Sequence, residues 1–238
     1  EAGVTNILEE GRILLFNKPL YWTSFDLVNK IRIMIRSATG LKKIKVGHAG
    51  TLDPLATGLM IICTGKATKR IEEFKDLDKE YIATVHIGAT TSSFDLETEV
   101  DGRYPTDHIT GDLVRDVLKK FEGKQKQVPP LHSAKFIDGK RAYEYARKHQ
   151  EITLAPKEIF VKSFKLEEYD WPYVTCRIVC SSGTYIRTLI NDLGKESRYL
   201  ATAIELKRVR IGKFILNDAI HSEDLVEGVK LNLINMQK

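Results

Sequence analysis

The sequence has little of what marks secreted, membrane-spanning or disordered proteins. Only three cysteines and seven prolines occur among its 238 residues. No apolar run reaches the roughly eighteen residues that a transmembrane helix needs, so no membrane association is expected. The apolar fraction of 42% is typical of a folded protein. The length is sufficient for one large domain with a sizeable core.

The three cysteines do not form a disulfide framework. Cys176 and Cys180 fall in one predicted strand, where a rise of about 3.3 Å per residue separates their Cα atoms by roughly 13 Å. A disulfide spans at most about 7 Å between Cα atoms. Cys63 lies in an apolar run and is expected in the core. This cysteine usage predicts a reduced, cytoplasmic protein.

Several common site types are also missing from the sequence. The spacing between Gly58 and Gly65 is too long for a P-loop, and Ala67 stands where that loop carries the Ser or Thr that binds magnesium. The six histidines lack metal-ligand spacing, and no CxxC, GxGxxG or GxSxG motif occurs. We therefore expect neither a metal nor a cofactor.

A single carboxylate stands in an otherwise uncharged, glycine-punctuated segment, 47–58. Charged residues make up 29% of the chain, yet Asp53 is the only one between Lys45 and Lys66. Desolvating a lone acid is costly, which points to a functional role. Without a metal or cofactor, one carboxylate can act as a nucleophile at an electrophilic carbon, such as that of a glycosidic bond.

Positive charge flanks this segment, within a chain of net charge +5. The flanking cations are Lys42, Lys43 and Lys45 on one side and Lys66, Lys69 and Arg70 on the other. A second basic region runs over 119–148. Such clusters suit a polyanion whose phosphates are held while one atom reacts, although a solvated lysine-rich surface has the same composition.

The order of elements predicts an α+β fold with a mixed, mainly antiparallel central sheet flanked by helices and loops. Strands are expected at 12–17, 59–63, 81–87, 157–168, 174–181 and 203–209. Helices are expected at 23–40, 66–74 and 106–121, after Gly183, and weakly at the end of the chain. Their expected apolar faces are Phe25, Val28, Ile31 and Ile35; Leu113, Val117 and Phe121; and Ile186, Leu189, Ile190 and Leu193.

Two further features point to function. The basic segment 123–156, which includes Tyr143 and Tyr145, interrupts the regular elements, and such insertions are more often functional than filler. Arg187 falls in the first turn of a predicted helix, where the dipole disfavours a cation by up to about 1 kcal/mol. Pairing with a carboxylate elsewhere would explain it, and a solvated surface arginine is the alternative.

Six motifs occur in a fixed order along nearly the whole chain. They are Lys18-Pro19 with Thr23-Ser24, then 47–58, 65–69, 79–81, 139–147 and 182–188. In this order they resemble the TruB family of pseudouridine synthases, which isomerise a uridine in the T arm of tRNA. The resemblance implies the pseudouridine synthase fold across 1–238 and a basic RNA-clamping insertion at about 123–156.

The same resemblance implies a reaction and its partners. Uridine 55 would be flipped out of its stack, and its glycosidic bond cut and re-formed through C5 without a cofactor. Addition of the aspartate to C1′ and addition to C6 of the base both stay open. The expected partner is the T-arm stem-loop of tRNA, bound by a cytoplasmic monomer that uses no guide RNA.

Site roles carry over from the resemblance residue by residue. Asp53 matches the catalytic aspartate, and Arg187 the arginine that pairs with it. Tyr81 matches the catalytic aromatic residue that stacks on the target base and is a candidate to help remove its C5 proton. The expected substrate-binding residues are His48 beside the flipped nucleotides, Leu206 in the pocket wall, Lys18 supporting the catalytic loop, Lys69 and Tyr185.

The chain departs from the family pattern in two places. Tyr21 stands where the family usually has glycine, so the loop should change conformation or the tyrosine should occupy a pocket. Too few residues follow the last predicted strand for the additional C-terminal RNA-binding domain of many members, which predicts weaker tRNA affinity.

Three other functions remain to be weighed. A non-catalytic RNA-binding or RNA-folding protein would be favoured by loss of Asp53, Tyr81 or Arg187, and all three are present. The guide-RNA-dependent enzyme that modifies ribosomal RNA is disfavoured by the insertion. A glycoside hydrolase would need a second acid, and none lies near Asp53 in sequence.

Overall fold

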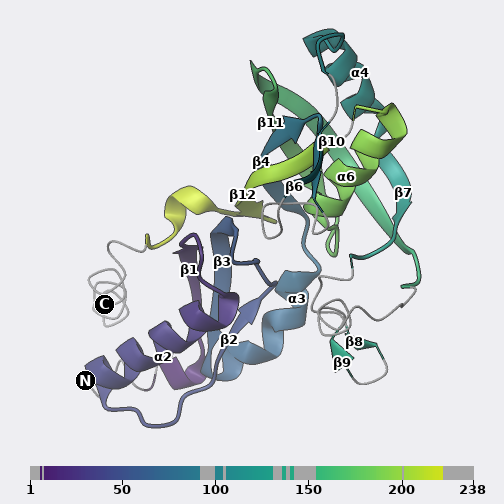
Figure 1. Ribbon diagram of the computed structural model, residues 1–238. Helices are drawn as coiled ribbons and strands as arrows, with labels where there is room; N and C mark the ends of the chain where they lie inside the picture. The colour runs from purple at the N-terminus through teal and green to yellow at the C-terminus, as the bar shows by residue number, and fades with distance from the viewer. Residues whose placement is uncertain are drawn as a thin grey trace. The chain divides into compact units, whose positions relative to one another are not determined.

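The chain divides into two units. The first unit comprises Glu1–Tyr81 and Lys207–Lys238, and the second unit comprises Ile82–Leu206. The computed structural model describes residues 6, 8–91, 100–103, 106–130, 136–137, 140–141, 154–199 and 201–221. Part of the predicted insertion, with Tyr143 and Tyr145, and the predicted final helix lie outside the described residues. Strands β4 (Lys79–Ile87) and β12 (Ala201–Ile211) contribute residues to both units (Figure 1).

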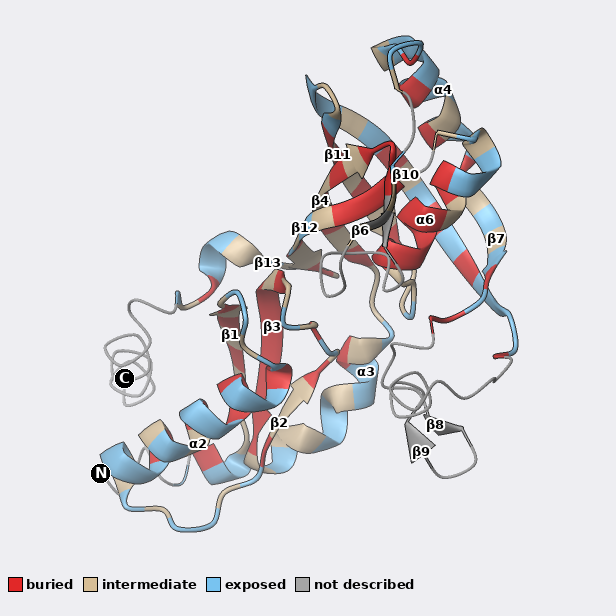
Figure 2. Cartoon of the chain, in the orientation of Figure 1, coloured by how far each residue is buried: buried red, intermediate tan, exposed pale blue. Residues whose placement is uncertain are grey.

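Strand β3 (Ala56–Thr64) organises the first unit. It pairs antiparallel with β1 (Ile13–Lys18) and β2 (Val46–Ala49), and it also borders β12, which pairs with β13 (Phe214–Ile215). All five residues from Leu59 to Cys63 are 0% exposed, so both faces of the strand are covered, as Figure 2 shows. The predicted buried strand and the core position of Cys63 are confirmed.

Helix α2 (Ser24–Thr39) has both of its predicted ends. Thr23 accepts a hydrogen bond from the Asp26 amide at 2.9 Å, and the Asp26 carboxylate accepts one from the Thr23 amide at 2.8 Å, which completes a capping box. Gly40 ends the helix in the left-handed conformation. The prediction for Phe25 is wrong: its side chain is 65% exposed, and Leu27 is buried instead.

Two short helices follow β3 in place of the one predicted. The 3-10 helix η1 (Gly65–Arg70) leads into α3 (Ile71–Lys75), and the short 3-10 helix η2 (Leu216–Asp218) follows β13. Both α2 and α3 contact β2, the strand that leads into the segment containing Asp53.

The second unit is built on neighbouring strands whose order in the sheet differs from their order in the chain. Strand β10 (Lys157–Asp170) lies between β7 (Gly123–Gln127) and β11 (Tyr173–Cys180), which borders β4, and β4 borders β12. The smaller hairpins are β5 (Ala89–Thr91) with β6 (Val100–Arg103), and β8 (Phe136–Ile137) with β9 (Lys140–Arg141). The predicted pairing of the strands at 157–168 and 174–181 is confirmed.

Two helices complete the second unit. Helix α6 (Ile186–Ser197) buries Ile186, Leu189, Ile190 and Leu193 as predicted. Helix α4 (Gly111–Lys120) packs on β10 but begins later than predicted, because Thr110, not Thr106, caps it by accepting a hydrogen bond from the Leu113 amide at 3.3 Å. Its buried residues are Val114 and Leu118, and Phe121 at its end is buried as predicted. The prediction for Leu113 is wrong, because its side chain is 39% exposed.

The predicted fold class is confirmed. The registers of β1–β3, β2–β3, β7–β10, β10–β11 and β12–β13 are all antiparallel, and one isolated parallel bridge joins Phe16 to Ile220. Cys63, Cys176 and Cys180 are buried and unbonded to one another. No helix in the described part of the chain is long and apolar enough to cross a membrane.

Gly58, at the start of β3, should tolerate no side chain. Its φ is +111°, and a Cβ there would lie 2.2 Å from the Arg208 carbonyl oxygen. We expect Gly58→Ala to lower the free energy of unfolding by about 2–5 kcal/mol, from backbone strain and steric overlap together. Urea denaturation monitored by circular dichroism measures the change.

Gly40→Ala provides the matched control. Gly40 also has a positive φ, +73°, but nothing lies within 4 Å of a Cβ built there. Only the conformational cost of about 1–2 kcal/mol should remain. Equal losses in the two variants would contradict the close approach of Arg208 to Gly58.

Candidate active site

Hydrogen bonds to the backbone of the Asp53 loop fix it to the start of α2 and to the residues just before that helix. The Ser24 hydroxyl accepts a bond from the Leu52 amide at 2.8 Å and donates one to the Leu52 carbonyl at 3.0 Å. The Tyr21 amide donates to the Pro54 carbonyl at 2.7 Å. Both residues that flank Asp53 are therefore held, and the carboxylate itself is half-buried. A group fixed in this way loses little further freedom when it reacts.

Arg208 holds the two ends of the same loop. This arginine is only 2% exposed; its Nε donates to the Leu59 carbonyl at 2.9 Å and its Nη2 to the Gly50 carbonyl at 3.2 Å. Sequence reasoning missed it. The signal was the position of Arg208 in the predicted strand 203–209. Side chains alternate between the two faces of a strand, so Arg208 lies on the same face as Leu206, which was predicted to form the pocket wall.

Lys18 places a buried positive charge close to Asp53. The side chain is 0% exposed, and its Nζ donates to the carbonyls of Pro19 at 2.9 Å and Trp22 at 2.6 Å. Burial lowers the pKa of Lys18 to about 8, against the charge of Asp53, which raises it. The support of the catalytic loop by Lys18 stays a prediction, because its hydrogen bonds end on Pro19 and Trp22 and only its charge links it to Asp53.

The remaining predicted residues of the first unit lie on three elements. His48 lies in β2 opposite Ile62, and burial together with the charges of Lys75 and Arg208 lowers its pKa, so the imidazole is neutral at pH 7. Tyr81 is 8% exposed in β4. Lys69 is exposed in the last turn of η1.

Three predicted residues belong to the second unit. Arg187 is 5% exposed in the first turn of α6, so the alternative of a solvated surface arginine is wrong. Tyr185 caps the same helix, where the Gln127 side chain accepts from its amide at 2.8 Å and donates to its carbonyl at 3.0 Å. Leu206 is half-buried in β12. The pairing of Arg187 with Asp53 stays a prediction.

Tyr21 fits neither of the two expectations for its position, which were a changed loop conformation or a pocket for the tyrosine side chain. Its φ is +70°, a left-handed conformation at which glycine is favoured, and its side chain is 73% exposed. The tyrosine therefore does not occupy a pocket. The strained residue persists because its amide is bonded to the Pro54 carbonyl of the Asp53 loop.

The described residues contain no group of three or more His, Cys, Asp or Glu side chains that could hold a metal ion. Two buried cations of the first unit, Lys18 and Arg208, lie close to the Asp53 loop. This arrangement offers a fixed carboxylate beside a buried ammonium, which is suited to nucleophilic chemistry by the carboxylate.

Comparison with known proteins identifies close relatives. Residues 36–186 match the family described as TruB family pseudouridylate synthase (N terminal domain). A Parabacteroides distasonis protein named tRNA pseudouridine synthase B is 53% identical over 228 residues, which cover 96% of this chain and 97% of that protein. A Phocaeicola vulgatus protein of the same name is 54% identical over 219 residues, 92% of this chain and 93% of that protein.

Solved structures also resemble the chain. The crystal structure of a Cbf5–Nop10–Gar1 complex contains a chain that is 26% identical, with a TM-score of 0.68. The match covers 94% of this chain and 56% of that chain.

The buried charge of Lys18 should make stability depend on pH. Between pH 8 and about 10.5, the folded protein has released the Lys18 proton while the unfolded chain retains it, so the stability contributed at this site rises with pH. We expect the free energy of unfolding, relative to that of Lys18→Met, to increase by up to about 3 kcal/mol across this window.

Urea denaturation of both proteins at pH 7.5, 9 and 10 measures the difference. Lys79, which is also buried, is present in both proteins, so its titration cancels. A difference that stays constant with pH, or that shrinks, would show that Lys18 is not destabilised by burial.

Proposed function

The chain belongs to the TruB family of pseudouridine synthases, and from this premise we propose that it converts uridine 55 in the T arm of tRNA to pseudouridine. Relatives named tRNA pseudouridine synthase B match it over nearly their whole length. The observation that carries the proposal is the half-buried Asp53, held on a loop whose neighbouring residues are each fixed by hydrogen bonds.

The reaction suits a single carboxylate. The bond between N1 of the base and C1′ of the ribose breaks, the uracil turns, and C5 bonds to C1′. The proton lost from C5 is balanced by the one gained at N1, so nothing is oxidised and no energy source is needed. Asp53 is the nucleophile. Arg208 joins the two ends of its loop by hydrogen bonds, and Lys18 acts on Asp53 through its charge.

The other site residues act on the extruded nucleotide. Tyr81 stacks on the target base, which offsets part of the unstacking cost by about 1–3 kcal/mol. His48, neutral at pH 7, fills space beside the flipped nucleotide. Leu206 forms an apolar wall, and Lys69 and Tyr185 bind the RNA.

Arg187 supplies the counter-charge to Asp53 in this proposal. A buried guanidinium in the first turn of α6 faces the positive end of the helix dipole and is stabilised by a carboxylate.

The names of the relatives favour tRNA over the alternatives. Relatives at 53–54% identity are named for tRNA, whereas the chain in the Cbf5–Nop10–Gar1 complex is 26% identical and much longer than the matched region. We therefore propose a cytoplasmic enzyme that acts on tRNA as a monomer without a guide RNA.

Asp53→Asn should abolish catalysis and leave RNA binding intact. We expect conversion of a T-arm stem-loop, assayed by chemical labelling of pseudouridine, to fall by about 10⁴-fold or more, because the amide is not a nucleophile. The Kd for the same RNA should change less than threefold. Asp116→Asn, an exposed acid of α4, is the matched control and should keep full activity. Equal conversion by the two variants would refute the role of Asp53.

Arg187→Met should lower kcat by about a hundredfold or more while the Kd for RNA changes little. Arg198→Met, at the exposed end of the same helix, controls for loss of one positive charge. Thermal unfolding of each variant checks that the protein is folded. A loss confined to affinity would mean that Arg187 binds a phosphate and not Asp53.

A further inference from the structure

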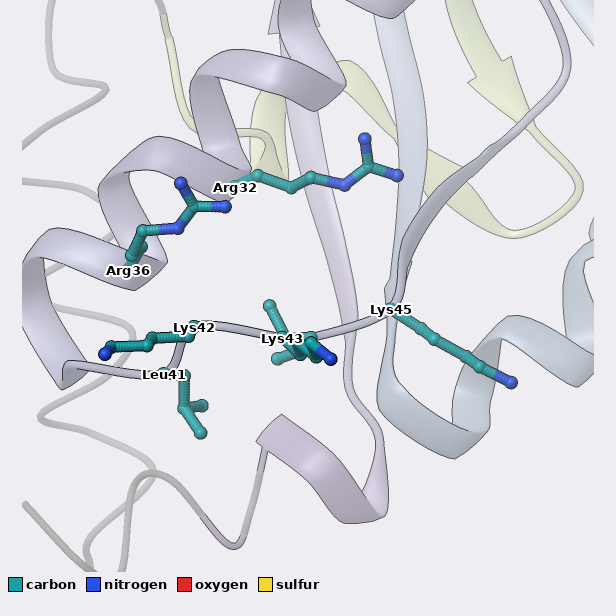
Figure 3. Close-up of a pocket in the computed structure, with 7 residues that line it drawn as sticks. Arg32, Arg36, Leu41, Lys42, Lys43 and Lys45 are labelled. Carbon is teal, nitrogen blue, oxygen red and sulfur yellow. The ribbon is translucent and has the colours of Figure 1, made fainter.

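A basic hollow lies in the first unit between the end of α2 and the segment that leads into β2. Its volume is about 530 Å³, and five of its seven lining residues are cations. Arg32 and Arg36 extend from α2, and Lys42, Lys43 and Lys45 come from the following segment (Figure 3). Half-buried Leu41 and Ile44 complete the lining. None of the described residues that line the hollow is acidic.

The backbone around the hollow is fixed. The Gly40 amide donates to the Arg36 carbonyl at 2.9 Å, and the Thr39 hydroxyl donates to the Ile35 carbonyl at 2.7 Å while accepting from the Leu41 amide. Arg32 donates to the Val46 carbonyl at 2.9 Å, which ties the helix to β2. The cations are thus presented by an ordered turn.

The side chains of Arg36, Lys42, Lys43 and Lys45 form no ion pair with any described residue. Some cations elsewhere in the same unit are paired, such as Lys66 with Glu10 and Arg70 with Glu73, whereas exposed Lys30 and Lys69 also form no ion pair with a described residue. The cations of the hollow are set apart by their clustering around one cavity. Five clustered cations repel one another, and an external anion would relieve that repulsion.

Two ordinary explanations do not account for the cluster. The C-terminus of α2 carries about half a negative charge, which one arginine such as Arg36 already compensates. The volume falls in the range of small-ligand sites, about 300–1,000 Å³, but such sites are lined mainly by apolar side chains. A cationic lining with several exposed lysines is typical of a surface that contacts phosphates.

We propose that this basic hollow binds backbone phosphates of the substrate tRNA at a distance from the target uridine. This inference rests on the proposed function. Ser24, which holds the Asp53 loop, and Arg36 lie on the same helix about 18 Å apart at 1.5 Å per residue. Arg36, Lys42 and Lys43 are exposed and are the phosphate-binding residues; Arg32 orients the helix.

The test is a triple variant, Arg36→Gln/Lys42→Gln/Lys43→Gln, assayed with a full-length tRNA transcript. Kd is measured by filter binding over a series of salt concentrations, and kcat and KM by pseudouridine formation. We expect affinity to fall by about tenfold or more and the slope of log Kd against log salt to decrease by about two to three. KM should rise in parallel, with kcat unchanged, because the hollow is remote from Asp53.

Two matched variants locate the effect. Lys30→Gln/Lys165→Gln/Lys213→Gln removes the same charge from exposed positions outside the hollow and should bind tRNA within threefold of the parent. Arg36→Lys/Lys42→Arg/Lys43→Arg keeps the charge and should do the same. Circular dichroism verifies that all three proteins are folded.

The outcomes separate this inference from the proposed function. Binding is measured independently of turnover, so a protein that failed to isomerise uridine could still show the loss of tRNA affinity. The inference is overturned if the hollow variant binds tRNA as the Lys30/Lys165/Lys213 variant does, or if kcat falls while KM and the salt slope stay unchanged. It is equally overturned if the charge-keeping variant loses affinity as the glutamine variant does.

Discussion

The buried guanidinium of Arg208 is the interaction on which the active-site loop depends. Its two hydrogen bonds reach carbonyls on either side of Asp53, at Gly50 and Leu59, and its own backbone presses against Gly58. The loop begins and ends on strands, and the Arg208 side chain that links its ends comes from β12. The charged guanidinium of Arg208 can be buried here because carbonyl oxygens accept hydrogen bonds from its N–H groups. The glycine at position 58 follows from the same contact, since any Cβ would collide with the Arg208 carbonyl.

The charges around Asp53 explain why so uncharged a segment can carry a reactive acid. Lys18 and Arg208 are both nearly inaccessible to solvent, and each depends on backbone carbonyls for its hydrogen bonds. The charge of Lys18 interacts with that of the nearby Asp53 carboxylate, which raises the pKa of Lys18 against the effect of burial. Residues 46–65 need no other charged side chain, because the compensating cations come from β1 and β12.

Patterns among residues that are neighbours in sequence predicted much of the fold and singled out Asp53. The helix at 23–40 followed from a capping threonine and a terminal glycine, and the strand at 59–63 from its apolar run; both are determined by neighbours in sequence. The start of α4 was misplaced because Thr106 and Thr110 are equally good caps, and only packing on β10 chooses between them. Asp53 stood out as a lone acid, whereas Arg208 did not, since its partners Gly50 and Leu59 lie about 150 residues away in the sequence. Tyr21 was misjudged because a strained φ is held by a tertiary hydrogen bond that no local pattern encodes.

Helix α2 fixes the distance between the Asp53 loop and the basic hollow in the first unit. Its first residue, Ser24, holds the Asp53 loop, and its last turn contributes Arg36 to the basic hollow. A rigid helix transmits no conformational change between these ends. It sets the distance from Asp53 at which a bound polyanion must place its phosphates when one of its nucleotides reaches Asp53. A ligand too short to span that distance can fill one site but not both. The helix therefore separates two contributions to catalysis, because contacts at the hollow change how tightly RNA is held, and contacts at the loop change how fast the glycosidic bond is broken.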